Sequence, residues 1–334
     1  MAKKIVTIGG GSGMPVINES LLLAGAKNIK SIVTVMDSGG VTGRMRTDSR
    51  GQEVAYSDAL RTLLSLIPPQ FADWKKIISL KEMLRRRNDR GQDLGYTIFS
   101  HYFGSENGFG EIQNLLETLT EVKFMGRVLP VTTAPTHLIF KTKSGFVHRG
   151  EHELDDKRMS ADTVTNIWLE PEVTAFPESV DAVKEADLII FSCGSFYGSV
   201  LVNLLPIGIQ QALKVNSGKK AYVTNLASTK NETDKFCPED FIRLLRKYTR
   251  LSKPLDYLIV PNLSRTGFEK KYPQVAAKYN LEHSHFLGWG KDELEEIQKS
   301  GVQIITHEAL VIDPVLKRLR HDPNKLSQTL KALI

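Results

Sequence analysis

The sequence predicts an α/β fold of the Rossmann-like, doubly wound kind, with a mostly parallel sheet, a helical insertion and a small β-unit. Three observations lead to this fold class. Short apolar runs recur along the chain, long helical patterns separate several of them, and loops rich in glycine or hydroxyl residues follow the runs. The apolar runs lie at 5–8, 31–35, 188–191, 221–224 and 257–260. A run that is apolar throughout, such as 188–191, is typical of a strand covered by helices on both faces.

The middle of the chain interrupts this alternation. Residues 52–125 are predicted to form a helical insertion, with breaks at Pro68-Pro69 and at 104–110. Residues 126–170 are predicted to form a small β-rich unit, with strands at 127–131, 137–142, 146–150 and 164–169. Because the chain has no internal repeats and no low-complexity linker, we expect residues 1–334 to form a single domain that contains both units.

Two more short strands are expected near the C-terminus, at 302–306 and 309–312. The tripeptide His321-Asp322-Pro323 then predicts the start of a helix, because aspartate is a favoured N-cap residue and proline is tolerated in the first turn. We therefore expect a closing helix that begins near Asn324.

Composition indicates an intracellular protein. A chain of 334 residues can bury a large core without disulfides or structural metals. Its two cysteines, Cys193 and Cys237, form neither a CxxC pair nor a disulfide framework, which fits a reducing compartment. The first residues lead into a short strand rather than a signal-peptide core, and no apolar run is long enough to span a bilayer. The expected location is the cytoplasm.

The charge of the chain favours an anionic ligand. The formal net charge is +6 and the pI is near 9.1, which are modest values for this length. A phosphorylated small molecule or nucleotide accounts for them as well as nucleic acid does, so we expect such a ligand and no nucleic-acid partner, and leave a homo-oligomer open. The densest basic run, Arg85-Arg86-Arg87 with Arg90, fits a solvated helix end and a ligand-facing or partner-facing patch equally well.

A glycine-rich loop after the first apolar run is the strongest functional signal. It consists of Gly9, Gly10, Gly11, Ser12 and Gly13, and an amphipathic helix is predicted directly after it. Glycines let a backbone approach a phosphate, and a helix N-terminus presents free N–H groups with a partial positive charge. Met14, which we include in the site, stands where G-x-G-x-x-G would have its last glycine. The alternative is a tight structural turn, and we favour ligand contact.

A second glycine-rich loop follows the run at 31–35. It contains Asp37, Ser38, Gly39, Gly40 and Arg44. In doubly wound folds the carboxyl ends of the strands form the binding crevice, so the two loops are expected to converge there. Asp37 could contact a sugar hydroxyl, a base edge or a metal, and Arg44 could pair with a phosphate. The alternative is a flexible lid whose charges meet only solvent.

Two further loops follow predicted strands. Gly194, Ser195 and Ser199 come after 188–191, where small residues and hydroxyls at a helix start can hold an anion. We favour a small buried thiol over a nucleophile for Cys193, because no histidine is near it in sequence, and the surroundings of Ser195 lack G-x-S-x-G spacing. Asn225 follows 221–224, where ligand contact and ordinary turn capping are equal alternatives.

Asp58 is the second carboxylate of interest and lies at the start of the helical insertion. On spacing alone, helix capping by Ser57 or Asp58 is the favoured interpretation. Asp58 is also a candidate catalytic or metal-binding carboxylate, together with Asp37. The eight histidines form no H-E-x-x-H or comparable set, so a zinc site is not expected.

Several of these segments, taken in order, resemble the bacterial YvcK-type gluconeogenesis factors and their relatives, the 2-phospho-L-lactate transferases (CofD). The similar segments are 9–13, 33–40 with Gly43-Arg44, 126–131, 186–189 with 194–197, 222–226 with Glu232-Thr233, and 321–326. The resemblance covers essentially the whole chain and implies a Rossmann-like nucleotide-binding core. Ser12-Gly13-Met14 stands in place of the Gly-Gly-Ala-Lys form typical of the transferases, which favours the YvcK branch.

The resemblance implies one of two functions. The YvcK branch binds UDP-sugars and is associated with carbon metabolism and with cell-envelope or cell-shape control, so we expect a regulatory protein that binds a nucleotide-diphosphate sugar. Its Asp37 and Asn225 would contact the base or sugar. The alternative is a CofD-like transferase, which moves a phospholactyl group from a nucleotide-activated donor to a deazaflavin precursor with magnesium. There Asp37 and Asp58 would hold the magnesium, and Arg44 would stabilise the transferred group.

Some positions depart from the family pattern. Where YvcK relatives show Gly-Asp-Ile-Arg-Asn, this chain has 57–61, which keeps the acidic residue and loses the arginine and the asparagine. Segment 192–199 replaces Gly-Pro-Gly-Ser-Leu-Tyr-Thr-Ser, and Gly95-Tyr96-Thr97 replaces Gly-Asn-Leu. Backbone N–H groups still cradle a phosphate after such changes, whereas the identity of the ligand can change. An NAD-dependent oxidoreductase ranks last, because the glycine-rich loop after Asp37 has no role in it.

Overall fold

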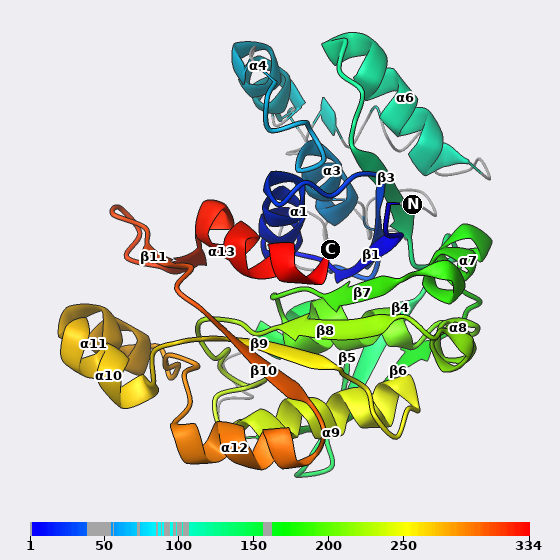
Figure 1. Ribbon diagram of the computed structural model, residues 1–334. Helices are drawn as coiled ribbons and strands as arrows, with labels where there is room; N and C mark the ends of the chain where they lie inside the picture. Colours follow the sequence, from blue (N-terminus) through cyan, green and yellow to red (C-terminus); the bar gives the residue numbers. More distant parts are fainter. Residues whose placement is uncertain are drawn as a thin grey trace.

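The computed structural model describes residues 2–38, 55, 57–71, 74–84, 107–155 and 162–334, with the single residues 86, 87, 89, 94, 95, 98 and 102 between them. The chain folds around a central parallel sheet with helices on both sides (Figure 1). The predictions for Gly39, Gly40 and Arg44, and for Arg85 and Arg90 of the basic run, fall outside the described residues.

The central sheet has seven strands in the order β10-β9-β8-β7-β1-β2-β3, and every neighbouring pair is parallel. The strands are β1 (Ile5–Gly9), β2 (Ile29–Val33), β3 (Gly126–Pro130), β7 (Leu188–Phe191), β8 (Lys219–Val223), β9 (Tyr257–Pro261) and β10 (Gln303–His307). The predicted α/β, doubly wound fold is confirmed. The strand order reverses between β1 and β7, which is where doubly wound sheets open a crevice for ligands.

Alternate residues of the central strands pack against two layers of helices. In β7, Leu188 and Ile190 join the core on one face, whereas Ile189 and Phe191 join the core on the other. One face is covered by α1 (Gly13–Leu23), α3 (Ser57–Leu64), α6 (Gly108–Thr120) and α13 (Pro323–Leu330), and the other by α7 (Pro177–Glu185), α8 (Ile209–Val215), α9 (Pro238–Thr249) and α12 (Lys291–Lys299). All four residues of β7 are therefore buried, as the apolar run predicts.

The two inserted units flank this sheet. Within 52–125 the described helices are α3, α4 (Trp74–Leu84) and α6, and α4 and α6 lie at the top of Figure 1. Strand β3 belongs to the central sheet, so the small β-unit begins after β3 and not at residue 126 as predicted. The rest of that unit is an antiparallel sheet in the order β5-β4-β6, formed by β4 (His137–Thr142), β5 (Val147–Arg149) and β6 (Val164–Glu170).

A C-terminal hairpin lies beside two short helices, α10 (Arg265–Lys271) and α11 (Pro273–Leu281) (Figure 1). The sequence predicts its first strand, β11 (Leu310–Ile312), but not the second, β12 (Leu319–His321). Tyr279 fixes the hairpin to α11, because its Oη accepts a hydrogen bond of 2.9 Å from the backbone N–H of Leu319. Helix α13 begins as predicted, with the Asp322 side chain accepting a hydrogen bond from the N–H of Asn324 at 2.9 Å.

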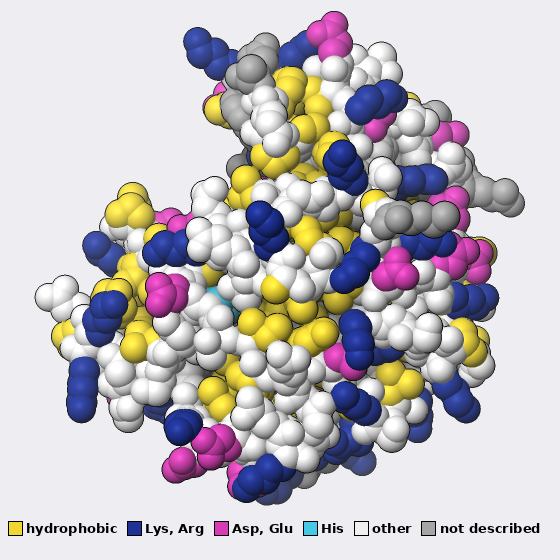
Figure 2. Space-filling model, viewed as in Figure 1, with side chains coloured by type: hydrophobic (Ala, Val, Ile, Leu, Met, Phe, Trp, Pro, Cys, Tyr) yellow, Lys and Arg dark blue, Asp and Glu magenta, His cyan; other side chains and the backbone are white. Residues whose placement is uncertain are grey.

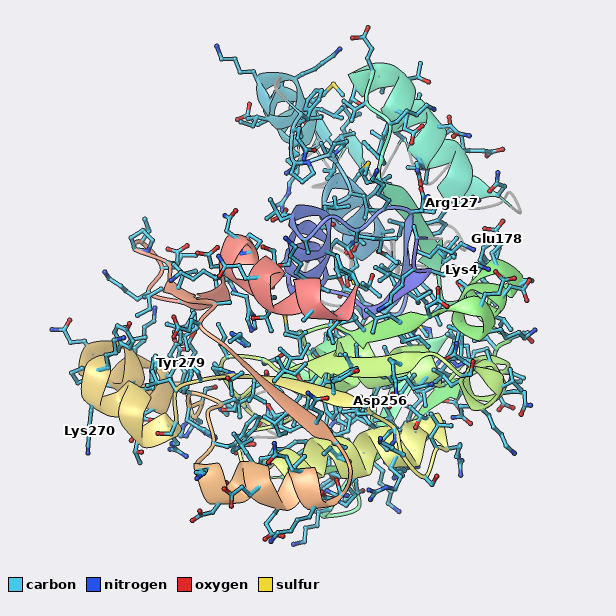
Figure 3. The ribbon with its side chains drawn as sticks, in the orientation of Figure 1. Lys4, Arg127, Glu178, Asp256, Lys270 and Tyr279 are labelled. Carbon is cyan, nitrogen blue, oxygen red and sulfur yellow. The ribbon has the colours of Figure 1, made fainter. Side chains whose placement is uncertain are left out.

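The two ends of the parallel strands lie on opposite sides of the molecule. Lys4, Arg127 and Asp256 mark the amino ends of strands on one side of Figure 3, and Tyr279 lies across the sheet from them. Ion pairs join elements on the amino side, such as Arg127 with Glu178 at 3.6 Å. The short turns η1 (Glu151–Asp155), η3 (Phe196–Val200) and η4 (Leu201–Leu204) and the closing turn η5 (Lys331–Leu333) complete the described elements.

Charge is spread over the surface rather than gathered on one element. Figure 2 shows Lys and Arg side chains across several elements of the visible face, with Asp and Glu side chains between them. In the part of the chain that the structure describes, no helix has the length and apolar character required to cross a membrane.

Candidate functional site

The glycine loop between β1 and α1 is shaped by two conformational requirements. Gly11 has a φ of +63°, in the left-handed region that favours glycine. At Gly13, a Cβ atom would lie 1.2 Å from the carbonyl oxygen of Cys193, so α1 can approach the loop after β7 only with glycine at this position. The packing therefore explains part of the glycine pattern, and it places the start of α1 at the crevice between β1 and β7.

The start of α1 presents backbone N–H groups to this crevice. Ser12 occupies the N-cap position with φ −81° and ψ −10°, and its side chain accepts no hydrogen bond from the first turn, in which no acidic residue lies. Neither the N-cap side chain nor an acidic residue of the first turn therefore offsets the partial positive charge of the helix start. The Met14 side chain is fully buried in the core, which leaves only its backbone available to a ligand.

A buried carboxylate holds the loop after β7. Glu232 is 3% exposed and accepts hydrogen bonds from the Ser195 hydroxyl at 2.9 Å and from the backbone N–H of Tyr197 at 3.0 Å. Ser195 Oγ in turn accepts a hydrogen bond of 2.8 Å from the N–H of Gly198 and so caps η3. The Ser195 hydroxyl is therefore engaged within the loop, as a donor to Glu232 and as an acceptor from Gly198, and these two bonds help to fix the conformation of the loop.

Asn225 clamps the same loop from the end of β8. Its Oδ1 accepts a hydrogen bond from the backbone N–H of Gly194 at 2.7 Å, and its Nδ2 donates to the carbonyl of Gly194 at 2.6 Å. The side chain therefore orders a neighbouring loop across the sheet edge, which is a different role from capping its own turn.

A cleft of about 310 Å³ opens between the start of α1, the loops after β7 and β8, and the C-terminal hairpin. Five of the predicted site residues line it, namely Ser12, Gly13, Gly194, Ser195 and Asn225. Its position at the carboxyl ends of β1, β7 and β8 is the one expected for a ligand site in a doubly wound sheet. The volume lies at the lower end of the range for small-molecule sites.

Two arginines line the hairpin wall of this cleft, one paired with a carboxylate and the other exposed. Arg318 forms a two-point ion pair with Glu282, in which Nη2 lies 2.9 Å from Oε1, and its Cζ lies 5.6 Å from the centroid of the Tyr279 ring. Arg320 borders the same cleft and is exposed. A cationic wall opposite a helix N-terminus suits a ligand with two phosphates. We call this region, lined by Ser12, Gly13, Gly194, Ser195, Asn225, Arg318, Arg320 and His321, the cationic cleft.

His321 adds a neutral imidazole to the wall. It is 7% exposed, and its ring centroid lies 5.2 Å from that of His307, which is 3% exposed. Burial lowers the pKa of His307 to about 4, and burial together with the charge of His307 lowers the pKa of His321 to about 3. Since both rings are neutral at pH 7, the positive charge of the cleft comes from the exposed Arg320 and from the start of α1, because Arg318 is paired with Glu282.

The other side of the glycine loop is acidic. Asp58 is 5% exposed; its Oδ2 accepts a hydrogen bond of 2.7 Å from the N–H of Gly11, and its Oδ1 lies 3.3 Å from Nη1 of Arg61. Burial raises the pKa of Asp58, the Gly11 hydrogen bond and Arg61 oppose that rise, and the charge of Asp37 adds to it. The sequence predicts that the N–H groups of this loop bind a phosphate, whereas the N–H group of Gly11 is hydrogen-bonded to the Asp58 carboxylate.

Asp37 and Ser38 lie beside this carboxylate. Asp37 Oδ2 accepts a hydrogen bond of 3.1 Å from the Ser57 hydroxyl at the start of α3. Ser38 Oγ lies 2.9 Å from Nδ1 of His152 and accepts a hydrogen bond of 3.0 Å from its backbone N–H. The loop after β2 is thus joined to both inserted units.

The predicted residues therefore form two groups that share the glycine loop. A Cβ atom at Gly10 would lie 2.6 Å from Asp58 Oδ2 and 3.4 Å from Ser199 Oγ, so this glycine faces the acidic group. Gly9 supports the loop from within, because its carbonyl accepts a hydrogen bond of 3.0 Å from Asn203. We call the group of Gly10, Gly11, Asp37, Asp58 and Ser199 the acidic side.

The thiol and metal hypotheses can be examined in the same region. Cys193 is 5% exposed and burial raises its pKa to about 12, which confirms a buried, protonated thiol. Within the described ranges, no three His, Cys, Asp or Glu side chains gather in a way that could hold a metal ion. Asp37 and Asp58 would therefore need oxygens from a ligand or water to complete a magnesium site.

Sequence reasoning missed several residues that the fold brings to the site. Arg318, Arg320 and His321 belong to a hairpin whose second strand is too short to predict, although His321 lies in the tail segment of the resemblance. Glu232 carries a signal only as part of that resemblance, and His152 carries none, because its partner Ser38 is 114 residues away.

Comparison with known proteins supports the resemblance. The sequence profile of the family "2-phospho-L-lactate transferase CofD" matches residues 5–310. A putative gluconeogenesis factor of Thermotoga maritima is 29% identical, with 99% of each chain covered. The gluconeogenesis factor of Bacillus subtilis is 26% identical, with 99% of this chain and 98% of that protein covered. A putative gluconeogenesis factor of Clostridium acetobutylicum is 30% identical over 98% of this chain and 68% of its own length.

The fold has a solved counterpart as well. The crystal structure of a UPF0052 family member from Bacillus halodurans superposes with a TM-score of 0.81 and 24% identity, with 98% of each chain covered. That structure supports the fold, and the profile covers most of the sequence, including the loops after β1, β2, β7 and β8. The chain therefore belongs to the CofD family, as the order of its loop motifs predicts.

Proposed function

We propose that this chain binds a nucleotide-diphosphate ligand of the UDP-sugar class and takes part in the control of carbon metabolism or cell-envelope synthesis. The observation that carries the ligand class is the cationic cleft, where the uncapped start of α1 faces Arg318 and Arg320. Helix N–H groups and guanidinium groups are the donors that bind diphosphates in proteins. The similarity to gluconeogenesis factors supports the part in carbon metabolism.

The two sides of the glycine loop suggest how such a ligand would lie. The cleft is small, so it would take the nucleoside diphosphate and leave the sugar to extend across the glycine loop. Asn225 and the loop that it orders would then border the nucleoside, and Asp37 would be within the region of the sugar hydroxyls. Carboxylates commonly bind sugar hydroxyls, whereas they repel phosphates unless a cation intervenes.

Isothermal titration calorimetry tests this proposal. We expect UDP-glucose or UDP-N-acetylglucosamine to bind, and the Arg320→Ala variant to bind about tenfold more weakly, because a charge-assisted contact to phosphate is lost. The matched control is Arg127→Ala, since Arg127 lies at the amino end of β3 (Figure 3). No heat with either UDP-sugar, alongside clear binding of another phosphoester, would remove the proposal.

A magnesium-dependent transferase of the CofD kind is the second candidate. It draws support from the acidic side, where burial raises the pKa of Asp58 and the charge of Asp37 adds to that rise. Two carboxylates in this relation fit a divalent cation, which would relieve their repulsion. Asp37 and Asp58 would hold magnesium, and the metal would neutralise charge on a transferred phosphorylated group.

Incubation of the purified protein with magnesium, nucleotide-activated phospholactate and a deazaflavin acceptor tests the second candidate. Product formation that is lost in Asp37→Asn would support it. If an authentic transferase turns over in the same mixture and this protein does not, the transferase function is excluded while sugar-nucleotide binding stands.

A further inference from the structure

Ser38, His152 and Glu153 form a row of side chains that neither proposed function uses. Ser38 Oγ lies 2.9 Å from Nδ1 of His152, and the second ring nitrogen, Nε2, lies 3.2 Å from Oε1 of Glu153. A hydroxyl, an imidazole and a carboxylate in this order form the arrangement that activates a serine as a nucleophile. Because Ser38 and His152 are 114 residues apart, only the folded chain contains it.

The mechanism uses one tautomer of the neutral imidazole. In this tautomer Nε2 of His152 carries the proton and faces Oε1 of Glu153, which accepts hydrogen bonds as a carboxylate. Nδ1 is then the unprotonated nitrogen and accepts the Ser38 hydroxyl proton. The backbone N–H of His152 also points to Ser38 Oγ at 3.0 Å, where it would stabilise the negative charge that develops as the proton leaves.

The row lies against the loops of the candidate site. Ser38 directly follows Asp37 of the acidic side. At Gly150, with a φ of +105°, a Cβ atom would lie 3.2 Å from Ser38 Oγ, so glycine lets η1 approach the serine. A Cβ atom at Gly198 would lie 2.8 Å from Oε1 of Glu151, which shows that η1 also touches the loop after β7. The turn therefore carries His152 to the carboxyl edge of the sheet.

We propose that Ser38 is an activated nucleophile that accepts a phosphoryl group from a phosphoester or phosphoanhydride whose reacting phosphate reaches the acidic side of the glycine loop. Ser38 Oγ forms a bond to phosphorus as the bond from phosphorus to the leaving oxygen breaks. The Ser38 proton passes to Nδ1 of His152 and from there to the leaving oxygen. Water then attacks the phosphorus of the phosphoserine, and the bond from phosphorus to Ser38 Oγ breaks. One proton of this water passes through His152 to Ser38 Oγ, and the water oxygen leaves as part of the phosphate. The net reaction is hydrolysis of the ligand.

Labelling with a fluorophosphonate, a neutral phosphorus electrophile, tests the nucleophile directly. Intact-mass and peptide mass spectrometry should find one adduct, on Ser38, and no adduct in Ser38→Ala. The His152→Gln variant should label about 100-fold more slowly, because general base catalysis contributes rate factors of this order. A control is His283→Gln, which removes an exposed histidine outside the row. Equal labelling rates for the unaltered protein and His152→Gln, or an adduct elsewhere, overturn the proposal.

Glu153 is a positioning residue, and its contribution has a spectroscopic signature. In ¹⁵N NMR spectra of the full chain, His152 should show a protonated Nε2 and an unprotonated Nδ1. Glu153→Gln should redistribute the two tautomers and slow labelling of Ser38 by about tenfold, since the acceptor that fixes the tautomer is weakened. An unchanged tautomer together with unchanged labelling would show that Glu153 plays no part in activating Ser38.

The reactivity of Ser38 does not rest on the proposed nucleotide-diphosphate ligand, whose phosphates would lie in the cationic cleft. Titration of UDP-glucose into the same preparation therefore separates the two. Labelling of Ser38 without heat from any UDP-sugar overturns the proposed function alone. Heat from a UDP-sugar without labelling overturns the Ser38 inference alone.

Discussion

The cationic cleft and the acidic side share one glycine loop and differ in charge and in how they are built. In the cleft, Asn225 and Glu232 hydrogen-bond the backbone of the loop after β7, so the loop is ordered before any ligand arrives. On the acidic side, Asp58 is buried beside Asp37, and its raised pKa reports a charge that is costly to bury. One side is arranged to receive an anion, and the other calls for a cation or a proton.

This difference suggests a division of labour along the ligand. Phosphates would bind where the N–H groups of α1 and the guanidinium groups lie, and the group beyond the phosphates would reach the carboxylates. Asp58 already accepts the Gly11 hydrogen bond, so this N–H group is engaged on the acidic side, whereas Ser12 and Gly13 line the cleft. The glycine loop therefore separates two charge environments within one crevice.

The close contact between α1 and the loop after β7, in the cationic cleft, should produce the largest effect when broken. Gly13→Ala would place a Cβ atom 1.2 Å from the Cys193 carbonyl oxygen, so α1 must move away from β7. We expect the free energy of unfolding to fall by about 3 kcal/mol or more, measured by urea denaturation. Gly290→Ala is the control, because its nearest neighbour would lie 3.6 Å away and its φ is −73°. Equal stabilities of the two variants would contradict the packing argument.

The second largest effect should come from acid, which should lower the free energy of unfolding through His321 in the cleft wall and His307 beside it. Folding lowers the pKa of His307 to about 4 and of His321 to about 3, so each histidine favours the folded state fully above its ordinary pKa of 6.5. That stabilisation is lost as the pH falls from about 6.5 through these values, with a full loss of the order of 3 kcal/mol for His307 alone. Urea denaturation at pH 7 and pH 4.5 measures the onset of this loss.

The pH effect has a matched control in the same wall. His307→Gln removes one titrating ring and should lose less stability between pH 7 and pH 4.5 than the unaltered chain. If both proteins lose the same amount, the buried pair does not account for the acid sensitivity.

The acidic side should give the smallest effect on stability and the opposite sign. Because burial raises the pKa of Asp58, its ionisation weakens folding as the pH rises through the folded pKa. Asp58→Asn removes the charge and keeps an acceptor for Gly11, so we expect a gain of about 1 kcal/mol at pH 8 and less at pH 4. Thermal denaturation at the two pH values measures it, with Asp181→Asn, an exposed carboxylate, as the control. A loss of stability at pH 8 would contradict this account.

Much of the fold follows from local patterns in the sequence. The apolar run at 188–191 coincides with β7, and the strands at 5–8 and 257–260 coincide with β1 and β9 to within one residue. These segments are predictable because every residue of a doubly covered strand is apolar or small. The run predicted at 127–131 is a strand, β3, as expected. The sequence does not predict which sheet β3 joins, because its pairing with β2 depends on the path of the chain around α6.

By itself the sequence determined most of the strands, the fold class and the loops that we propose as the ligand site, because hydrophobic period, glycine positions and caps act over a few residues. Only the tertiary structure decided which of those loops line the cationic cleft and which form the acidic side. It joined Asp58 to Gly11, Glu232 to Ser195 and Ser38 to His152, and it brought Arg318 and Arg320 to the start of α1. Each of these contacts joins segments far apart in the chain, and their charge and hydrogen-bond partners exist only where the strands end together.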